Sequence, residues 1–369
     1  MKNKIAGFII LLVLILIFAF LAASLQPSLG RVSGKVNSLQ QVDQMVAEQF
    51  PASKSLKLMQ VALRYFGGNK QQNGVFICKD SLMLDVKPTD LKIANTNMQE
   101  MKRFVRKFEC PSYLMLIPTA SAIQQYKVPS YAEIYDQKAF IDEAYRRMSG
   151  LINSIDVYPT LFSHQDEYIY YRTDNAITGL GGYYVYTAAS KKLGNLRVRG
   201  LEEFDVEHID YDYYGDLYDR SPYRMINPDK VSAYVFSKYR RNYIVTHYDE
   251  NGPRRYYTLY PDWKQKLGTT MDMLLGGMSP IIDISVTNSQ QGSSLLIFGD
   301  RSVQSYLPFL LINYGRVTIV DTSSVTPQQL EDIFVEDYNQ VLFAYSVDRF
   351  VLEDQLSIIK QLPINEPLD

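Results

Sequence analysis

The chain has few of the side chains that usually act as catalytic bases, nucleophiles or metal ligands. Its histidines are His164, His208 and His247, and its cysteines are Cys78 and Cys110. No spacing among them is typical of a zinc site, and we expect neither a metal nor another cofactor. In an exported chain the two cysteines could form a disulfide that closes a loop of about thirty residues. Two unpaired, buried cysteines are equally compatible with the sequence, because spacing along the chain says nothing about distance.

Three aspartates around Gly215 are a second candidate for metal chemistry. Asp210, Asp212 and Asp216 lie in an acidic, tyrosine-rich stretch. They lack the ligand spacing and the closing glutamate of an EF-hand calcium loop. The sequence therefore favours a solvated acidic loop over a calcium site.

Two further segments carry recognisable motifs. Residues 170–178 read YYRTDNAIT and are followed by Gly181 and a YYVY run at 183–186, and residues 299–310 read GDRSVQSYLPFL. Together they resemble the bacterial DHHW family, whose signature reads YYRTDHHWT before a glycine and a tyrosine-rich helix. The second segment is similar to that family's nucleophile segment, D-S-Y-x-x-S-F-x-P-F-L. The likeness covers residues 70–200 and 275–350 in the same order, with weaker matches at 116–119 and at Asp321.

The resemblance implies a fold and a chemistry. The fold would be an SGNH-hydrolase-like three-layer α/β/α sandwich with a mostly parallel sheet, related to exported alginate O-acetyltransferase proteins. Such proteins are tethered to a membrane and work beside membrane-bound O-acyltransferases that supply acyl groups for cell-surface polysaccharide. Their chemistry would use a serine nucleophile after Gly-Asp and an Asp-x-His pair, in which the histidine is the base and the aspartate orients it.

The departures from the family pattern fall on the chemical positions. Aligned without gaps, the nucleophilic serine corresponds to Arg301, the two histidines to Asn175 and Ala176, and the tryptophan to Ile177, whereas Asp174 is retained. A guanidinium is permanently protonated and is no nucleophile, and an alanine cannot accept a proton. The sequence therefore predicts a non-catalytic, SGNH-like pseudoenzyme that binds an envelope glycan or an O-acyltransferase partner.

The alternative is an active O-acetyltransferase or esterase on a surface glycan with rearranged catalytic groups. Ser302 is one residue from the nucleophile position, although its expected role is the N-cap of the following helix. His208 or His247 could serve as a substitute base. The residues expected to line the old cleft are Tyr170, Arg172, Asn175 and Ser302.

Position 301 supports a more specific expectation. In a triad the aspartate and the nucleophile lie on either side of the imidazole, so Asp174 and Arg301 should face each other. The long side chain of Arg301 can cross the space that an imidazole would fill, and its guanidinium can donate hydrogen bonds to a carboxylate. We therefore predict an Asp174–Arg301 ion pair in the former catalytic centre.

The N-terminus predicts a membrane anchor. Residues 5–23 are uncharged and apolar, and nineteen residues at about 1.5 Å each span about 28 Å, close to the thickness of a bilayer core. Lys2 and Lys4 precede the run, so residues 1–4 are a cytoplasmic tail, residues 5–24 an anchor, and the rest is extracytoplasmic. A cleaved signal peptide ending near Ala22-Ala23-Ser24 is the alternative. Residues 25–65 read as a juxtamembrane linker and a helix.

The rest of the chain, residues 66–369, shows the alternation of an α/β domain. Unbroken apolar runs at 113–117, 295–298, 317–320 and 341–345 indicate buried strands, while 90–108 and 135–150 have helical spacing. We also expect a hairpin from 75–78 and 82–84, a strand at 155–158, and a tyrosine-rich insertion at about 200–280. The net charge of −2 argues against a nucleic-acid partner.

Overall fold

The computed structural model describes residues 53–194, 197–238, 241–261, 270–287 and 292–363. The predicted cytoplasmic tail, the anchor at 5–24 and most of the linker lie outside these residues. Within the described ranges no helix combines the length and the apolar character needed to cross a membrane. The chain divides after Asn69 into two units. The first contains α3 (Ser53–Phe66), as the helical spacing there predicts.

The second unit is built on one large mixed sheet. Among the described residues this sheet has eight strands in the order β5-β4-β13-β11-β12-β10-β8-β9. The first five run parallel, and β10, β8 and β9 continue the sheet with antiparallel pairing. The bounds are β5 (Asn153–Ile155), β4 (Ser112–Ile117), β13 (Gln340–Ser346), β11 (Ser294–Gly299), β12 (Arg316–Asp321), β10 (Ile281–Val286), β8 (Tyr243–Asp249) and β9 (Gly252–Tyr256).

Two expectations about strands need correction. Residues 243–260 were assigned to an insertion, but β8 and β9 extend the main sheet, because β10 pairs with β12 on one side and with β8 on the other. The sheet is therefore mixed, with its parallel part confined to five strands. The strand expected at 155–158 ends at Ile155, and a helix, α7 (Tyr158–Ser163), begins three residues later with Pro159 in its first turn.

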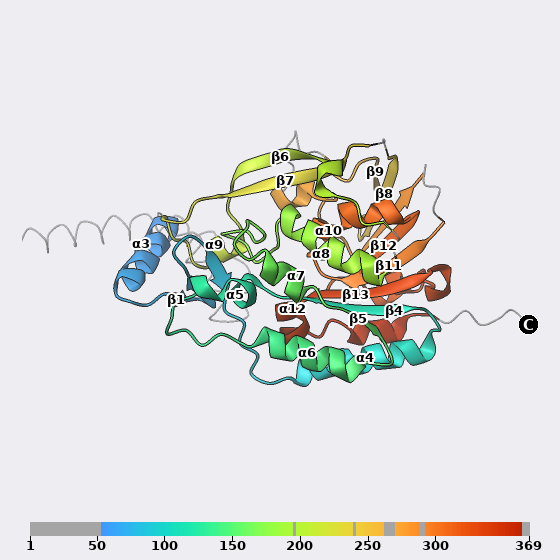
Figure 1. The fold of residues 1–369 in the computed structure, drawn as a ribbon, viewed down its shortest axis with the longest axis horizontal. Coiled ribbons are helices and arrows are strands. Elements are labelled where there is room, and N and C mark those ends of the chain that lie inside the picture. The colour runs from blue at the N-terminus through green and yellow to red at the C-terminus, as the bar shows by residue number, and fades with distance from the viewer. Residues whose placement is uncertain (1–52, 195–196, 239–240, 262–269, 288–291, 364–369) are drawn as a thin grey trace, which may run out of the picture. The chain divides into compact units, whose positions relative to one another are not determined.

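Helices lie on both faces of the parallel part of the sheet (Figure 1). On one face lie α4 (Lys92–Lys107), α6 (Gln137–Met148) and α12 (Val347–Leu352), and on the other α8 (Gly179–Lys192) and α10 (Val303–Leu310). Phe104 of α4 packs edge-on against Phe298 of β11 and Phe343 of β13, with ring centroids 5.8 and 5.2 Å apart. These strands are buried on both sides, which explains their unbroken apolar sequences.

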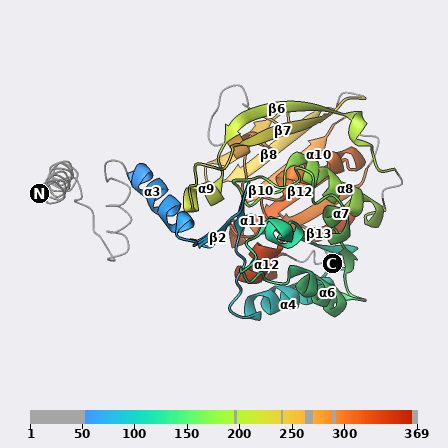
Figure 2. The same cartoon turned by 60° about the vertical axis from the view of Figure 1, so that its left-hand side comes forward.

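Two smaller sheets complete the unit. The predicted hairpin is confirmed as β2 (Val75–Ile77) and β3 (Leu82–Leu84), which β1 (Gln71–Gln72) extends. Within the expected insertion, β6 (Phe204–Tyr213) and β7 (Asp229–Phe236) form a long antiparallel pair (Figure 2). Short helices are α5 (Ala120–Ile123), α9 (Asp216–Arg220) and α11 (Pro327–Leu330).

Both cysteines are free thiols in the part of the chain that the structure describes. The disulfide alternative is therefore not realised. Cys78 is buried, and burial raises the pKa of its thiol to about 12. This thiol stays protonated and unreactive at neutral pH.

Candidate functional site

The candidate site lies where β4, β11 and β13 end. β11 ends at Gly299, and the turn that follows carries Asp300, Arg301 and Ser302 into α10. The Asp300 carboxylate accepts hydrogen bonds from the backbone amide of Ser302 at 2.9 Å and from the amide and hydroxyl of Ser346 at 2.8 and 2.7 Å. Asp300 thus ties the turn to the end of β13 and fixes the direction in which Arg301 leaves it. Carboxyl ends of parallel strands are the usual place for sites in open α/β sheets.

Asp174 lies at the tip of a narrow loop formed by residues 170–177. Tyr170 and Ile177 form an isolated antiparallel bridge, and the Tyr171 amide donates to the Ala176 carbonyl at 3.1 Å. The loop leads directly into α8, whose N-cap hydroxyl, from Thr178, accepts from the Gly181 amide.

Close packing of α8 against α10 brings this loop to the turn after β11. A Cβ at Gly182 of α8 would lie 2.1 Å from the backbone oxygen of Ser305 on α10. Only glycine permits this approach at position 182, because any larger residue would bring its Cβ into the backbone of α10. Because α8 begins five residues after Asp174 and α10 begins two residues after Arg301, the packing of these helices places Asp174 and Arg301 opposite each other.

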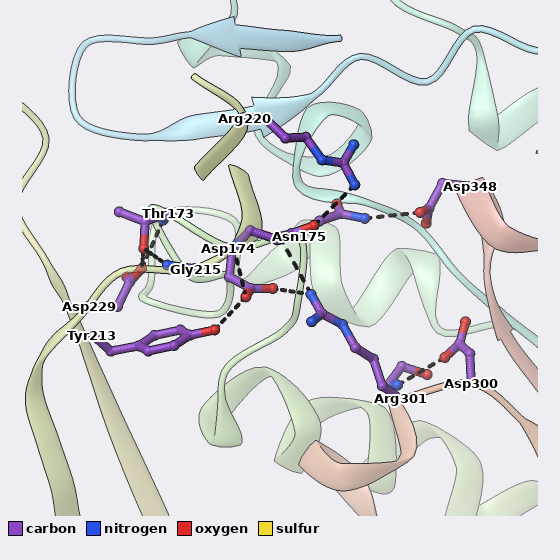
Figure 3. Close-up of polar contacts among 12 residues, drawn as sticks. Thr173, Asp174, Asn175, Tyr213, Gly215, Arg220, Asp229, Asp300, Arg301 and Asp348 are labelled. Atoms are coloured by element: carbon purple, nitrogen blue, oxygen red, sulfur yellow. Dashed lines mark hydrogen bonds and ion pairs between the residues drawn. The ribbon is translucent and has the colours of Figure 1, made fainter. Parts of the chain in front are cut away.

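The predicted ion pair between these residues is confirmed. Nη2 of Arg301 donates to Oδ1 of Asp174 (Figure 3). The side chain of Asp174 has no exposed surface, whereas that of Arg301 is 37% exposed. Oδ2 of Asp174 accepts from the Tyr213 hydroxyl at 2.6 Å and from the Asp216 amide at 3.4 Å. Burial raises the pKa of Asp174, and the positive charge of Arg301 opposes this rise. Since every contact to its two oxygens is a donor, the geometry fits the ionised form.

The ion pair extends into a network of four charges. Oδ1 of Asp216 lies 3.6 Å from Nη2 of Arg301, and Oδ2 of Asp216 lies 3.2 Å from Nη2 of Arg220. The amide of Asn175 also donates to Oδ1 of Asp216, at 3.2 Å. Two carboxylates and two guanidinium groups thus alternate across the centre, so their charges cancel.

Residues of the β6–β7 pair and of the segment between its strands make hydrogen bonds to the loop that carries Asp174. Asp229, the first residue of β7, is buried and accepts from the amides of Arg172 and Thr173 at 2.7 and 2.8 Å and from the hydroxyls of Thr173 and Tyr168. The Gly215 amide donates to the Thr173 hydroxyl at 3.0 Å. Sequence reasoning missed Asp229 and Tyr213 and considered Asp216 only for calcium, because no local pattern connects these residues to a loop about forty to sixty residues away.

The two positions occupied by histidine in the family motif have unrelated environments. Ala176 packs against a buried cluster that includes Tyr171, Tyr213 and Met271. The side-chain amide of Asn175 donates to Oδ2 of Asp348 at 3.0 Å. Burial and the neighbouring charge of Asp300 raise the pKa of Asp348 to about 6. Neither Asn175 nor Ala176 has a side chain that could act as a general base for a nucleophile at position 301.

A cavity of about 150 Å³ remains beside the ion pair. It is lined by Tyr170, Asn175 and Ser302, as predicted, together with Ala176, Arg301 and others. Tyr170 uses its hydroxyl to donate to the Pro118 carbonyl at 2.8 Å. The placement of Arg172 in the cleft was wrong: its guanidinium lies over the Tyr168 ring, 4.7 Å from the centroid, and donates to the Pro228 carbonyl.

Ser302 occupies the N-cap position of α10 but its side chain does not cap the helix. Its hydroxyl oxygen is buried and has no hydrogen-bond partner among the described residues. The expected capping contact of the Ser302 side chain is therefore wrong, because the backbone of Ser302 is helical rather than in the extended conformation that capping residues usually have.

No histidine among the described residues lines the cavity. His247 is buried in β8, with Nδ1 2.8 Å from the Ser279 hydroxyl and Nε2 2.8 Å from the Leu275 carbonyl. His208 lies on the exposed β6–β7 pair, with Nδ1 2.9 Å from the Ser232 hydroxyl. Burial lowers the pKa of both imidazoles. The suggested substitute bases are thus placed elsewhere. Within the described ranges no group of acidic, cysteine or histidine side chains could hold a metal ion.

Comparisons with known proteins found relatives of both the sequence and the fold. A sequence model of the family described as DHHW protein matches residues 87–320. A DHHW family protein from Eubacterium siraeum is 22% identical, with a TM-score of 0.63 over 80% of this chain and 98% of that chain. Bacillus cereus PatB1 with a sulfonyl adduct is 16% identical, with a TM-score of 0.64 over 78% of this chain and 98% of that chain. The O-acetyltransferase domain of Pseudomonas putida AlgJ is 14% identical, with a TM-score of 0.50 over 78% of this chain and 98% of that chain.

No curated protein sequence matches the chain. The structural likenesses identify an α/β fold with a large mixed sheet, similar to SGNH-like acetyltransferases.

Proposed function

The chain belongs to the DHHW family, and from this premise we propose that it is a non-catalytic, SGNH-like protein acting in the O-acylation or assembly of a cell-surface polysaccharide. The observation that supports this proposal is the Asp174–Arg301 ion pair, which joins the two positions that correspond to the aspartate and the serine of the family motifs. Its partners would be a membrane-bound O-acyltransferase or the polysaccharide itself.

The chemistry of the centre supports a non-catalytic role. Acyl transfer through a serine needs a hydroxyl, a base beside it and a group that orients the base. Position 301 presents a cation in place of the hydroxyl, and position 176 presents a methyl group in place of the base. Asp174, the retained member, accepts from Arg301 and Tyr213 and is not available to orient an imidazole.

The rival is an enzyme that uses Ser302. The unpartnered hydroxyl of Ser302 beside the cavity is the observation in its favour. Against it, this oxygen is buried from solvent, and no described residue lies within hydrogen-bond distance to take its proton. A nucleophile without a neighbouring base is weak at neutral pH.

The test compares the purified protein with two variants, using an aryl acetate as substrate and a serine-reactive phosphonate as label. We expect neither hydrolysis above the uncatalysed rate nor covalent labelling of the wild type. The combined change Arg301→Ser, Asn175→His and Ala176→His serves as the matched variant, in which the serine and both histidines of the family motif are present. Turnover or labelling of the wild type that disappears in Ser302→Ala would refute the proposal and establish the rival.

The location of the protein is also part of the proposal. An anchor at residues 5–24 would hold the domain on the extracytoplasmic side of the cell membrane, close to an integral O-acyltransferase. Protease added to intact spheroplasts should then digest the domain, and removal of residues 1–24 should release it from the membrane fraction. Protection from protease in intact spheroplasts would contradict this orientation.

A further inference from the structure

A second hollow in the structure is larger than the former catalytic cleft. It has a volume of about 440 Å³ and lies between the end of β7, the start of β8, the segment after β9 and α10. We call it the tyrosine groove, after Tyr234, Tyr243, Tyr257 and Tyr260 among its lining residues. Pockets that hold small organic ligands usually measure about 300–1,000 Å³. The tyrosine groove falls within this range, whereas the cleft of about 150 Å³ beside Arg301 falls below it.

Two of the tyrosines are fixed in place before any ligand arrives. The Tyr260 hydroxyl donates to the backbone carbonyl of Tyr234 at 2.9 Å and accepts from its amide at 3.1 Å. The ring of Tyr234 packs on Phe309, with centroids 5.3 Å apart, and a Cβ at Gly179 would lie only 2.3 Å from it. Rings held in this way lose little side-chain entropy when a ligand binds.

Tyr257 differs from these rings because it is 76% exposed. Because the ring is exposed and lines the groove, it can turn to cover a ligand there. An exposed ring beside two fixed rings provides apolar faces at several angles, together with hydroxyl groups at their edges.

The charges of the groove favour a neutral ligand. Among the described residues that line it, the charged ones are Asp205 and Arg241, whose charges cancel. The guanidinium of Arg241 already donates to the backbone carbonyls of Leu311 and Ile312, at 3.2 and 2.8 Å. The remaining polar groups are neutral hydroxyls and an amide, from Ser237, Thr258, Asn242 and the tyrosines.

We propose that the tyrosine groove binds a segment of a neutral, hydroxyl-rich saccharide chain. A pyranose ring has an apolar C–H face that can stack on a tyrosine ring and a rim of hydroxyls that can pair with neutral donors and acceptors. The inference rests on the proposed function in one respect, the polysaccharide as ligand. It places saccharide binding in the tyrosine groove and not in the cleft beside Arg301.

The test is an isothermal calorimetric titration. Maltohexaose, cellohexaose or xylohexaose is added to the full-length protein in detergent, and the heat of binding is measured. Hexagalacturonate serves as an anionic probe and decaproline as a peptide probe, because proline-rich segments also bind aromatic grooves. We expect at least one neutral hexasaccharide to bind at micromolar to millimolar concentration and neither of the other probes to compete with it.

Variants of exposed tyrosines then locate the site. Tyr257→Ala should weaken binding of the neutral hexasaccharide by about tenfold or more, while Tyr257→Phe, which keeps the ring, should remain within about threefold of the wild type. Tyr248 on β8 is 40% exposed and lies outside the groove, so Tyr248→Ala is the matched control and should bind as the wild type does.

Three results would overturn the inference. These are no binding of any neutral hexasaccharide at millimolar concentration, binding that Tyr257→Ala leaves unchanged, or preferential binding of decaproline or hexagalacturonate in the groove. None of them bears on catalysis, which the aryl acetate assay decides separately. Conversely, esterase activity in the wild type would refute the non-catalytic role and leave the groove standing.

Discussion

Replacing Arg301 by methionine should destabilise the protein more than replacing Asp174 by asparagine. The reason is the unequal exposure of the two partners. Asp174 has no exposed side-chain surface, so in Arg301→Met its charge stays buried without a cation. Arg301 is 37% exposed, so in Asp174→Asn its guanidinium can turn to water.

The expected sizes follow from this difference. Breaking a buried ion pair by removing one partner costs about 3–5 kcal/mol, and an exposed pair contributes about 0–1 kcal/mol. In Arg301→Met, the Tyr213 hydroxyl and the Asp216 amide still stabilise the carboxylate, which lowers the expected cost to about 2–4 kcal/mol. In Asp174→Asn the side-chain carbonyl can still accept from Tyr213, and the expected cost is about 1–2 kcal/mol.

The cost of Arg301→Met should also depend on pH. Arg301 lowers the pKa of Asp174, which burial raises, so its removal raises this pKa further. A carboxyl whose pKa is higher in the folded than in the unfolded state stabilises the fold at low pH and loses that contribution as pH rises through the folded pKa. The variant should therefore lose less stability relative to wild type at about pH 5 than at about pH 7.

Urea unfolding of the wild type and both variants at the two pH values measures these quantities. Arg349→Met is the matched control, because Arg349 also lines the cavity but pairs with Glu353 on an exposed helix face. It should cost about 0–0.5 kcal/mol at either pH. A smaller cost for Arg301→Met than for Asp174→Asn, or one below about 0.5 kcal/mol at pH 7, would refute the reasoning.

Three further changes have distinct expected outcomes. The folded pKa of Asp348 is about 6 and its ordinary value is 3.8, so this carboxyl should make the wild type less stable at pH 7 than at pH 4 by about 2 kcal/mol; Asp348→Asn should lack that decline in urea unfolding. Gly182→Ala should lower the melting temperature, at a cost of about 1–3 kcal/mol, because α8 and α10 must separate; an unchanged melting temperature would contradict their close contact. Asp229→Asn turns a side-chain amide toward backbone donors, so it should cost about 1–3 kcal/mol and speed proteolysis at residues 172–175; equal cleavage rates would argue against its role in holding the loop.

The sequence predicts the parallel part of the sheet well and its antiparallel edge poorly. Strands β4, β11, β12 and β13 are buried on both faces, so their apolar runs are unbroken and easy to recognise. In β8 only Val245, Thr246 and His247 are buried, and β9 has no buried residue, so their sequences are as polar as those of an insertion. Only their pairing through β10 reveals that they belong to the main sheet.

The site shows the same division between local chemistry and distant contacts. The Asp174–Arg301 pair could be predicted because two motifs of one family fix both positions. A carboxylate and a guanidinium at these positions are then expected to form an ion pair. The hydroxyl of Tyr213 and the carboxylate of Asp229 could not, since their contacts with the loop depend on how β6 and β7 cross it. Arg172 was misplaced because Tyr168, four residues earlier, offers its ring as a nearer partner.

The burial of Asp174 has a consequence for the evolution of this centre. A mutation of Arg301 to serine, the residue of the family motif, would introduce a hydroxyl but would leave the Asp174 carboxylate without its cation, and no histidine would be there to replace it. That first step would lower stability by about the same few kilocalories per mole as any other loss of Arg301. Most proteins are only about 5–15 kcal/mol stable, so a step of this size is strongly selected against unless compensated. We therefore expect Arg301 to be retained because the folded state needs it, whether or not it has any role in binding.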